Sequence, residues 1–177
     1  ENRRVRLRTA SEMKARFPKI LSHLQSENQR LRARKQFTEW YGYSAPRSLD
    51  AHDTAHIAVP LLANQGLCAL IPPQYQGQLC PMASGGFTIT LASKCPYSPE
   101  FVLGIVNSKL LFWYLTRISN VFRGGWVTCT KQYFGELPIR KLNLDQTTDR
   151  SQHDEIGALV QKLNGVVHKL HLERREH

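Results

Sequence analysis

The sequence predicts an α+β fold: an irregular, mostly antiparallel sheet with a buried helix, flanked by a basic N-terminal helix and a C-terminal heptad helix. Three observations predict it. Short β-prone runs separated by glycine and proline occupy residues 57–91. A strongly apolar stretch that opens with helix-start signals follows at 98–115, and a heptad pattern covers 156–170. A chain of 177 residues is long enough to bury one core.

The N-terminal helix is predicted from apolar residues at helical spacing, with Pro18 in its first turn; they are Phe17, Ile20, Leu21, Leu24 and Leu31. Cations gather at its end, where they favour the negative pole of the helix dipole: Arg30, Arg32, Arg34 and Lys35. Residues 1–10 show no pattern, so we expect an arm there.

The sheet is predicted from three runs, at 57–60, 67–71 and 87–91. Turn residues divide them: Pro72, Pro73, Gly77, Pro81, Gly85 and Gly86. We expect short strands and long polar loops.

Ser98, Pro99 and Glu100 supply an N-cap, a first-turn proline and a first-turn acid for the next helix. This helix is apolar nearly all round, which predicts that it lies in the interior. After it, 126–130 and 133–139 are predicted strands, with Pro138 near the end of the second.

The last helix carries an a/d seam made by Ile156, Leu159, Leu163, Val166 and Leu170. Ser151 and Asp154 resemble a capping box at its start. Gly157 and Gly165 each weaken a helix by about 1 kcal/mol, so a second helix must hold this one. We favour a helix of a longer parent protein, or the N-terminal helix, over self-dimerisation. The predicted domains are 1–36, 37–147 and 148–177.

The net charge of +10 is unevenly placed: +8 in residues 1–35, +2 in 36–147 and zero in 148–177. A basic balance favours polyanionic partners, and a soluble basic arm on a near-neutral domain stays open as the alternative explanation of the charge. No apolar run reaches the roughly 18 residues of a transmembrane helix. Without an initiator Met or a signal peptide, we expect a cytoplasmic piece of a longer protein.

Metal binding and catalysis are the weaker interpretations. The four cysteines, Cys68, Cys80, Cys95 and Cys129, include no C-x-x-C pair, so reduced thiols are expected. His52 and His56, with Asp50 and Asp53, have no second ligand pair. Catalytic motifs are incomplete: 71–74 lacks the Asn of an Asn-Pro-Pro-aromatic motif, 82–86 lacks cofactor-loop spacing, and 12–14 lacks the Asp of a nuclease site. We therefore expect no enzyme activity, metal or cofactor in this chain.

Recognition chemistry is better represented. Arg, Lys, Gln and Thr side chains contact bases and phosphates, and glycine turns approach phosphates closely. The candidate DNA-binding residues are Tyr43, Ser44, Arg47, Ser84, Lys94, Arg123, Gly124, Gly125, Thr128, Thr130, Lys131 and Gln132. Structural alternatives stay open: Trp126 and Tyr133 as core residues, Trp40 and Tyr41 as packing for the basic helix, and Arg123 as a helix-end cation.

Several motifs together resemble a known family: "FPKI", the segment 40–47, "IAVP", "LGIVNSKLLFWYL", "FRGGW" and "LPI". The chain is similar to the TaqI-like C-terminal specificity domain, the target recognition domain of restriction-modification DNA methyltransferases. Ala55 and His56 replace the Pro-Lys common in that family, which removes a cation. The last helix resembles the spacer helices of type I specificity subunits.

The resemblance implies a bacterial α+β domain that binds double-stranded DNA. It also implies a parent adenine-N6 methyltransferase that uses S-adenosylmethionine, often fused to a Mg²⁺-dependent endonuclease. The methyltransferase domain of the parent would be a partner of this chain. The alternatives are a nucleic-acid enzyme, and a helical protein–protein interaction module with non-specific nucleic-acid affinity.

Overall fold

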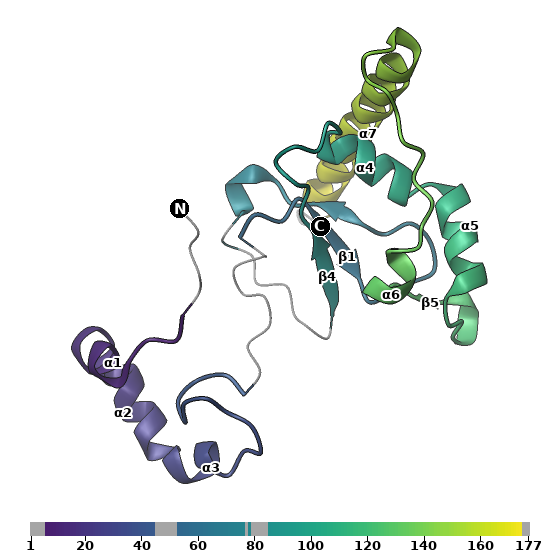
Figure 1. The fold of residues 1–177 in the computed structure, drawn as a ribbon. Coiled ribbons are helices and arrows are strands. Elements are labelled where there is room, and N and C mark those ends of the chain that lie inside the picture. The colour runs from purple at the N-terminus through teal and green to yellow at the C-terminus, as the bar shows by residue number, and fades with distance from the viewer. Residues whose placement is uncertain (1–5, 45–52, 77, 79–84, 175–177) are drawn as a thin grey trace. The chain divides into compact units, whose positions relative to one another are not determined.

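The computed structural model describes residues 6–44, 53–76, 78 and 85–174 (Figure 1). The chain divides into two compact units, 1–51 and 52–177, which are described separately as the N-terminal unit and the C-terminal unit. The α+β class is confirmed: the C-terminal unit combines small antiparallel sheets with helices. The predicted division at residues 36 and 147 stays a prediction.

The N-terminal unit contains three short helices, α1 (Ala10–Arg16), α2 (Pro18–Ser26) and α3 (Asn28–Arg32). The predicted helix is confirmed in type but is broken after Ser26. Helix α1 was not expected, because its signal is a capping box rather than an apolar period. The Thr9 side chain accepts a hydrogen bond from the backbone N–H of Glu12, and the Glu12 carboxylate accepts one from that of Thr9.

The sheet of the C-terminal unit has β1 (Ile57–Pro60) at its centre. Strands β3 (Ala69–Leu70) and β4 (Gly86–Ile89) pair with it on either side, both antiparallel. Ile57 lies opposite Leu70 on one side and Ile89 on the other. The three predicted strands are therefore confirmed: β1 has the predicted bounds, whereas β3 and β4 are shorter than expected. A 3₁₀ turn, η1 (Pro73–Tyr75), follows β3.

A second, two-stranded sheet pairs β2 (Leu62–Ala63) with β5 (Val127–Thr128). Strand β2 was not predicted, because two residues give no period. It matters for the architecture because it ties the start of the unit to the segment after the glycine pair. Ala63 and Val127 are both buried in the core.

The predicted apolar helix is two helices, α4 (Pro99–Val106) and α5 (Lys109–Ile118), bent by 58°. Ser98 caps α4 as predicted, accepting a hydrogen bond from the backbone N–H of Phe101. Most of α4 is buried, but α5 is only half buried, so the expectation of a wholly interior helix was wrong for α5. Within the described residues no single helix is long and apolar enough to cross a membrane; only the bent α4–α5 pair meets that test.

The bend has a specific cause in the Asn107–Ser108 pair. The Asn107 side chain accepts a hydrogen bond from the backbone N–H of Cys68 at 2.9 Å, and its amide donates one to the Cys68 carbonyl at 2.8 Å. Ser108 then caps α5 by accepting a hydrogen bond from the backbone N–H of Leu111. This Asn-Ser pair, which is part of the motif behind the family resemblance, therefore joins the residue before β3 to the junction of α4 and α5.

The predicted strand at 133–139 was wrong. A short helix, α6 (Lys131–Phe134), follows β5, and the chain after it has no regular structure until α7. The reason is tertiary: Tyr133 and Phe134 both pack against the core, which consecutive residues of a strand cannot do from one face. The Phe134 ring meets Phe87 of β4 edge-on at 5.5 Å between centroids.

The C-terminal helix α7 (Thr147–Glu173) is confirmed as a long helix, but it begins before Ser151, so the predicted capping box was wrong. Its first turn is held by buried Asp149, whose carboxylate accepts hydrogen bonds from the backbone N–H of Asn143 and from Arg140. Helix α7 then packs on α4. A Cβ at Gly104 of α4 would lie 2.7 Å from Ile156 and 3.0 Å from Val160, so glycine permits this close approach.

Candidate nucleic-acid interface

The two-glycine segment forms the tip of a hairpin that follows α5. Val121 and Val127 form an antiparallel bridge, and the backbone N–H of Phe122 donates to the Trp126 carbonyl at 2.6 Å. The 3₁₀ turn η2 (Arg123–Gly125) lies between them. Gly124 and Gly125 have φ of 79° and 78°, a left-handed conformation that side-chain-bearing residues rarely adopt. The glycine pair is therefore required by the shape of the tip.

The side chains at this tip are exposed. Arg123 is exposed, and Phe122 and Trp126 retain 52% and 40% of their accessible surface. Within the part of the chain that the structure describes, the Arg123 guanidinium makes no ion pair or hydrogen bond. The last turn of α5 already contains Arg117, and the helix ends at Ser119. The structure thus favours a surface position for Arg123 and Trp126. It gives less support to Arg123 as a helix-end cation and to Trp126 as a core residue.

Helix α6 places Lys131 and Gln132 outward. Lys131 and Gln132 are both exposed, whereas Tyr133 and Phe134 of the same turn are partly buried against the core. The sequence left open whether Tyr133 is a core residue or a surface residue, and in the structure it is partly buried against the core. Figure 1 shows α5, β5 and α6 together at one side of the C-terminal unit, and contacts between α5 and α6 support that arrangement.

The two candidate threonines are less available. Thr128 lies in β5, and its hydroxyl oxygen is buried without a hydrogen-bond partner among the described residues. Its carbonyl accepts a hydrogen bond from Ser119 at 2.5 Å. Thr130 is partly buried at the N-cap of α6, although its side chain makes no capping bond. The accessible part of the predicted cluster is therefore Arg123, the glycine pair, Lys131 and Gln132.

The other candidates lie on separate segments. Tyr43 (72% exposed) and Ser44 belong to the N-terminal unit. Arg34 orders their loop: it donates to the carbonyls of Trp40 and Gly42, and to the Ser44 hydroxyl at 3.1 Å. Within this unit Trp40 meets Tyr41 edge-on and the Arg32 guanidinium lies over the Trp40 ring, whereas the alternative that the aromatic pair packs the basic helix onto the sheet stays a prediction.

Lys94 is exposed in the turn between Ala92 and Cys95, on the connection from β4 to α4. The candidates Arg47 and Ser84 lie outside the described residues, as do His52, Asp50 and Cys80. Nothing in the structure brings Lys94 to the hairpin tip, and the two units are not placed relative to one another.

Among the described residues no group of three or more His, Cys, Asp or Glu side chains is arranged to hold a metal ion. His56 has a structural role: its Nδ1 accepts a hydrogen bond from the backbone N–H of Leu91. The thiols of Cys68, Cys95 and Cys129 are free. Burial raises the pKa of the Cys68 thiol to about 12, with a smaller contribution from Cys129, and burial also raises the pKa of Cys129.

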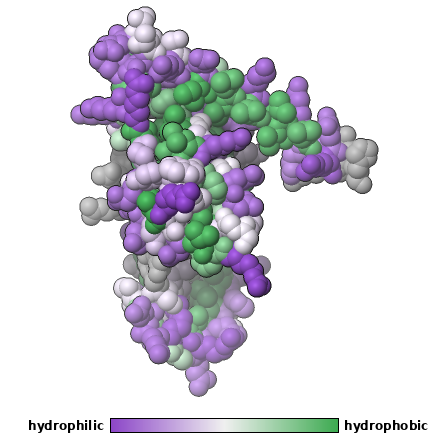
Figure 2. All heavy atoms as spheres, turned by 90° about the vertical axis from the view of Figure 1, so that its right-hand side faces the viewer, coloured by the Kyte–Doolittle hydropathy of each residue, from purple (hydrophilic) through white to green (hydrophobic). Residues whose placement is uncertain are grey.

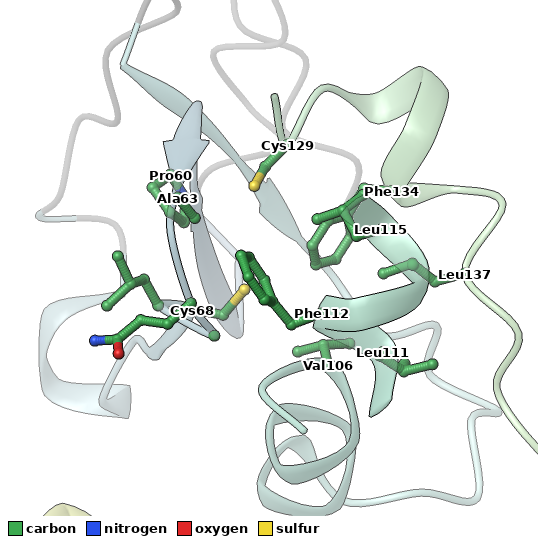
Figure 3. A pocket seen from close by; sticks show the side chains of 13 residues that line it. Pro60, Ala63, Cys68, Val106, Leu111, Phe112, Leu115, Cys129, Phe134 and Leu137 are labelled. Carbon is green, nitrogen blue, oxygen red and sulfur yellow. The ribbon is translucent and has the colours of Figure 1, made fainter. Parts of the chain in front are cut away.

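Cys68 and Cys129 lie at the wall of a small cavity between the second sheet and α5, with Phe112 beside them (Figure 3). The cavity has room for about one water molecule, far less than the roughly 300 Å³ of a small-molecule site. It is a packing gap in the core, and we assign it no ligand.

Sequence reasoning missed one part of this surface, the outer face of α5. Leu110 and Trp113 are 70% and 54% exposed, and the Arg117 guanidinium lies over the Trp113 ring at 5.3 Å. Figure 2 looks at this side of the C-terminal unit and shows hydrophobic and hydrophilic atoms interspersed there. The three-and-four spacing of Leu110, Trp113 and Arg117 was a signal for an exposed helix face, but the high apolar content of the stretch concealed it.

A comparison with curated proteins finds the Type II restriction enzyme and methyltransferase RM.Eco57I of Escherichia coli, 23% identical over 169 residues. The match covers 91% of this chain and 17% of the relative's length. No family model matches the chain, and no solved structure matches it significantly. The chain is thus distantly related to one segment of a restriction and modification enzyme. The narrower resemblance to the TaqI-like specificity domain stays a prediction.

Proposed function

We propose that this chain is the target recognition domain of a restriction-modification enzyme and binds a short sequence in double-stranded DNA. Methylation of adenine, with S-adenosylmethionine, and any Mg²⁺-dependent cleavage would belong to other parts of the parent protein. The chain itself would contribute binding and no catalytic group. Its relationship to a segment of RM.Eco57I supports a place in such an enzyme.

The observation that carries the proposal is the exposed hairpin tip, together with the exposed residues of α6 that follow it in the chain. Arg123, Lys131 and Gln132 are three accessible side chains whose chemistry suits base edges and phosphates, and the glycine pair lets the backbone approach closely. The Val121–Val127 bridge and the packing of Phe134 on Phe87 hold the backbone that carries these side chains. A backbone held in place limits where these side chains can reach, and base recognition needs such positioning more than attraction to phosphate charge does.

The test is selection of ligands by the 177-residue chain from a random duplex DNA pool, at low and at moderate salt. We expect one short motif to be enriched at both salt concentrations, because hydrogen bonds to bases do not depend on counterion release. Sequence-blind binding that disappears at moderate salt would contradict recognition by this chain alone.

Three variants then locate the contact. R123K keeps the charge but removes the planar, two-pronged donor, so it should lose the motif while keeping non-specific affinity if Arg123 contacts a guanine. Q132A should relax the motif at one position, at a cost of about 1–3 kcal/mol for the preferred site. K141A, which removes another exposed cation outside the cluster, is the matched control and should leave the motif unchanged. A motif that survives R123K and Q132A would place recognition elsewhere in the chain.

A further inference from the structure

The second half of α7 has no packing partner among the described residues. Every residue from 161 to 174 is exposed, although this part of the helix carries several large apolar side chains. Leu163 and Leu170 retain 62% and 51% of their accessible surface. An unsupported helix of this length is marginal in water, and Gly165 weakens it further.

Four of the exposed apolar residues form one stripe along the helix, Leu159, Leu163, Val166 and Leu170, whereas Val167 and Leu172 lie off it. Their steps of three and four are those of a coiled-coil seam. The stripe is continuous with Ile156 and Val160, which already pack on α4. Figure 2 shows it as hydrophobic atoms along the helix that reaches to the right of the view.

The charged side chains next to the stripe indicate which kind of helix can bind to it. With Leu163 and Leu170 at a positions, Lys162 and Lys169 fall at g positions, and Val167 and Arg174 fall at e positions. From 161 to 174 the helix has three cations, Lys162, Lys169 and Arg174, against one carboxylate, Glu173.

This charge pattern argues against two possible partners of the stripe that belong to the chain itself: a second copy of α7 and the N-terminal unit. A parallel pair of α7 helices would place Lys169 against Arg174, and an antiparallel pair would bring lysines of the two g positions together. The N-terminal unit is an equally poor complement, because its helices and the segment after them carry Arg30, Arg32, Arg34 and Lys35. The sequence-based preference for the N-terminal helix as partner is therefore not supported by charge.

We infer that the stripe on α7 binds a separate amphipathic helix, with leucine-like residues in an a/d repeat and Asp or Glu at the positions facing Lys162 and Lys169. This inference does not depend on DNA recognition. It adds a protein-docking surface to the chain, on residues that do not belong to the candidate nucleic-acid interface.

The test uses the 177-residue chain and two synthetic helical peptides, each about four heptads long, with the same leucine a/d repeat. One peptide has Glu at its e and g positions, and the other has Lys. Binding is measured by fluorescence anisotropy at moderate salt, and a scrambled peptide of the Glu composition controls for attraction to the basic chain. We expect the Glu peptide to bind at least about tenfold more tightly than the other two.

Variants on α7 separate the stripe from general charge. L163A and L170A should each weaken binding of the Glu peptide about tenfold, since each removes buried methyl and methylene groups from the seam. L172A is the matched control, because Leu172 is also exposed on α7 but lies off the stripe, and it should bind as the parent chain does. The pair K162E/K169E should reverse the preference between the two peptides.

Three results would overturn the inference. Equal binding of the Glu peptide and its scrambled form would leave only charge attraction. Unchanged binding after L163A and L170A would remove the stripe from the contact. A dimer in sedimentation that L163A and L170A abolish, with no peptide binding, would assign the stripe to a second copy of the chain. Failure here leaves the DNA selection experiment unaffected, because no peptide takes part in it.

Discussion

Asn107 shows how one residue decides the arrangement of elements distant in sequence. Its side chain forms hydrogen bonds with both the backbone N–H and the backbone carbonyl of Cys68, which lies 39 positions earlier. The Asn107 amide thus pairs with this backbone as a neighbouring strand would, at the bend between α4 and α5. The neighbouring Gly66 leaves room for this contact, since a Cβ there would lie 2.4 Å from the Asn107 carbonyl oxygen. Asn107 and Ser108 of the NSKL motif are therefore explained by architecture.

Cys68 provides a prediction at the same scale. Because only the thiolate reacts with maleimides, and the pKa of Cys68 is raised to about 12 in the folded chain, its modification at pH ~8 should be slowed about 100- to 1,000-fold relative to the unfolded chain. Peptide mass mapping after timed labelling, with and without denaturant, measures this ratio. A native rate within about tenfold of the denatured rate would contradict the burial of this thiol.

The same shift has a consequence for stability against pH. A raised folded-state pKa means that the folded chain holds its proton more tightly, so stability is fully present below the ordinary thiol pKa of 9.0. It should fall as pH rises from 9.0 towards about 12, and C68A should remove this part of the loss. Denaturant unfolding at a pH about one unit below 9.0 and at one midway to 12, compared between the parent chain and C68A, measures the difference.

At the scale of elements, the contact between α4 and α7 organises the C-terminal unit. It joins a helix that follows the sheet to the long helix that ends the described chain, through Gly104 on one side and Ile156 and Val160 on the other. Both partners of Gly104 are β-branched and stiff, so they have little freedom to make room for a methyl group.

Two glycine-to-alanine substitutions should therefore have opposite effects. G104A should destabilise the chain by about 1–3 kcal/mol through overpacking, whereas G165A should stabilise it by up to about 1 kcal/mol, because nothing lies near a Cβ at Gly165. Denaturant midpoints give both values. The added change I156A should recover part of the loss in G104A, and additivity of the two changes would argue against contact at this position.

At the scale of the whole molecule, charge and core are separated. All members of the hydrophobic core cluster belong to the C-terminal unit, whereas residues 1–35 carry most of the net charge. This separation assigns different parts of the proposed DNA binding to different parts of the chain. The basic segment would supply non-specific attraction, and the hairpin tip and α6 are the proposed site of sequence preference.

A fragment of residues 52–177 should therefore unfold cooperatively and keep the preferred DNA motif, with weaker overall affinity. Its dependence of log affinity on log salt should be shallower than that of the full chain, by about 0.9 for each phosphate that residues 1–51 neutralise. Affinity titrations at several salt concentrations measure the slope. An unchanged slope would mean that residues 1–51 do not bind DNA, and disappearance of the motif would place recognition in the N-terminal unit.

Much of the fold follows from local patterns. The β1, β3 and β4 runs, the Ser98 cap and the long helix α7 were all predicted, because alternation, caps and heptads are properties of neighbouring residues. The errors have tertiary causes. A helix, α6, forms where a strand was predicted, because Tyr133 and Phe134 both pack against the core. Helix α7 begins before Ser151, where its first turn is held by the bond between Asp149 and the backbone of Asn143. For the candidate site, sequence supplied the residue types but not their exposure.

The sequence by itself determined the α+β class, the positions of the main helices and strands, the glycine tip and the uneven charge, because each depends on composition or short spacing. Only the tertiary structure decided which candidate side chains are accessible and which apolar faces lack a partner among the described residues. Burial is the reason: whether Thr128 or Leu163 is covered depends on segments far away in the sequence, and no local pattern contains that information.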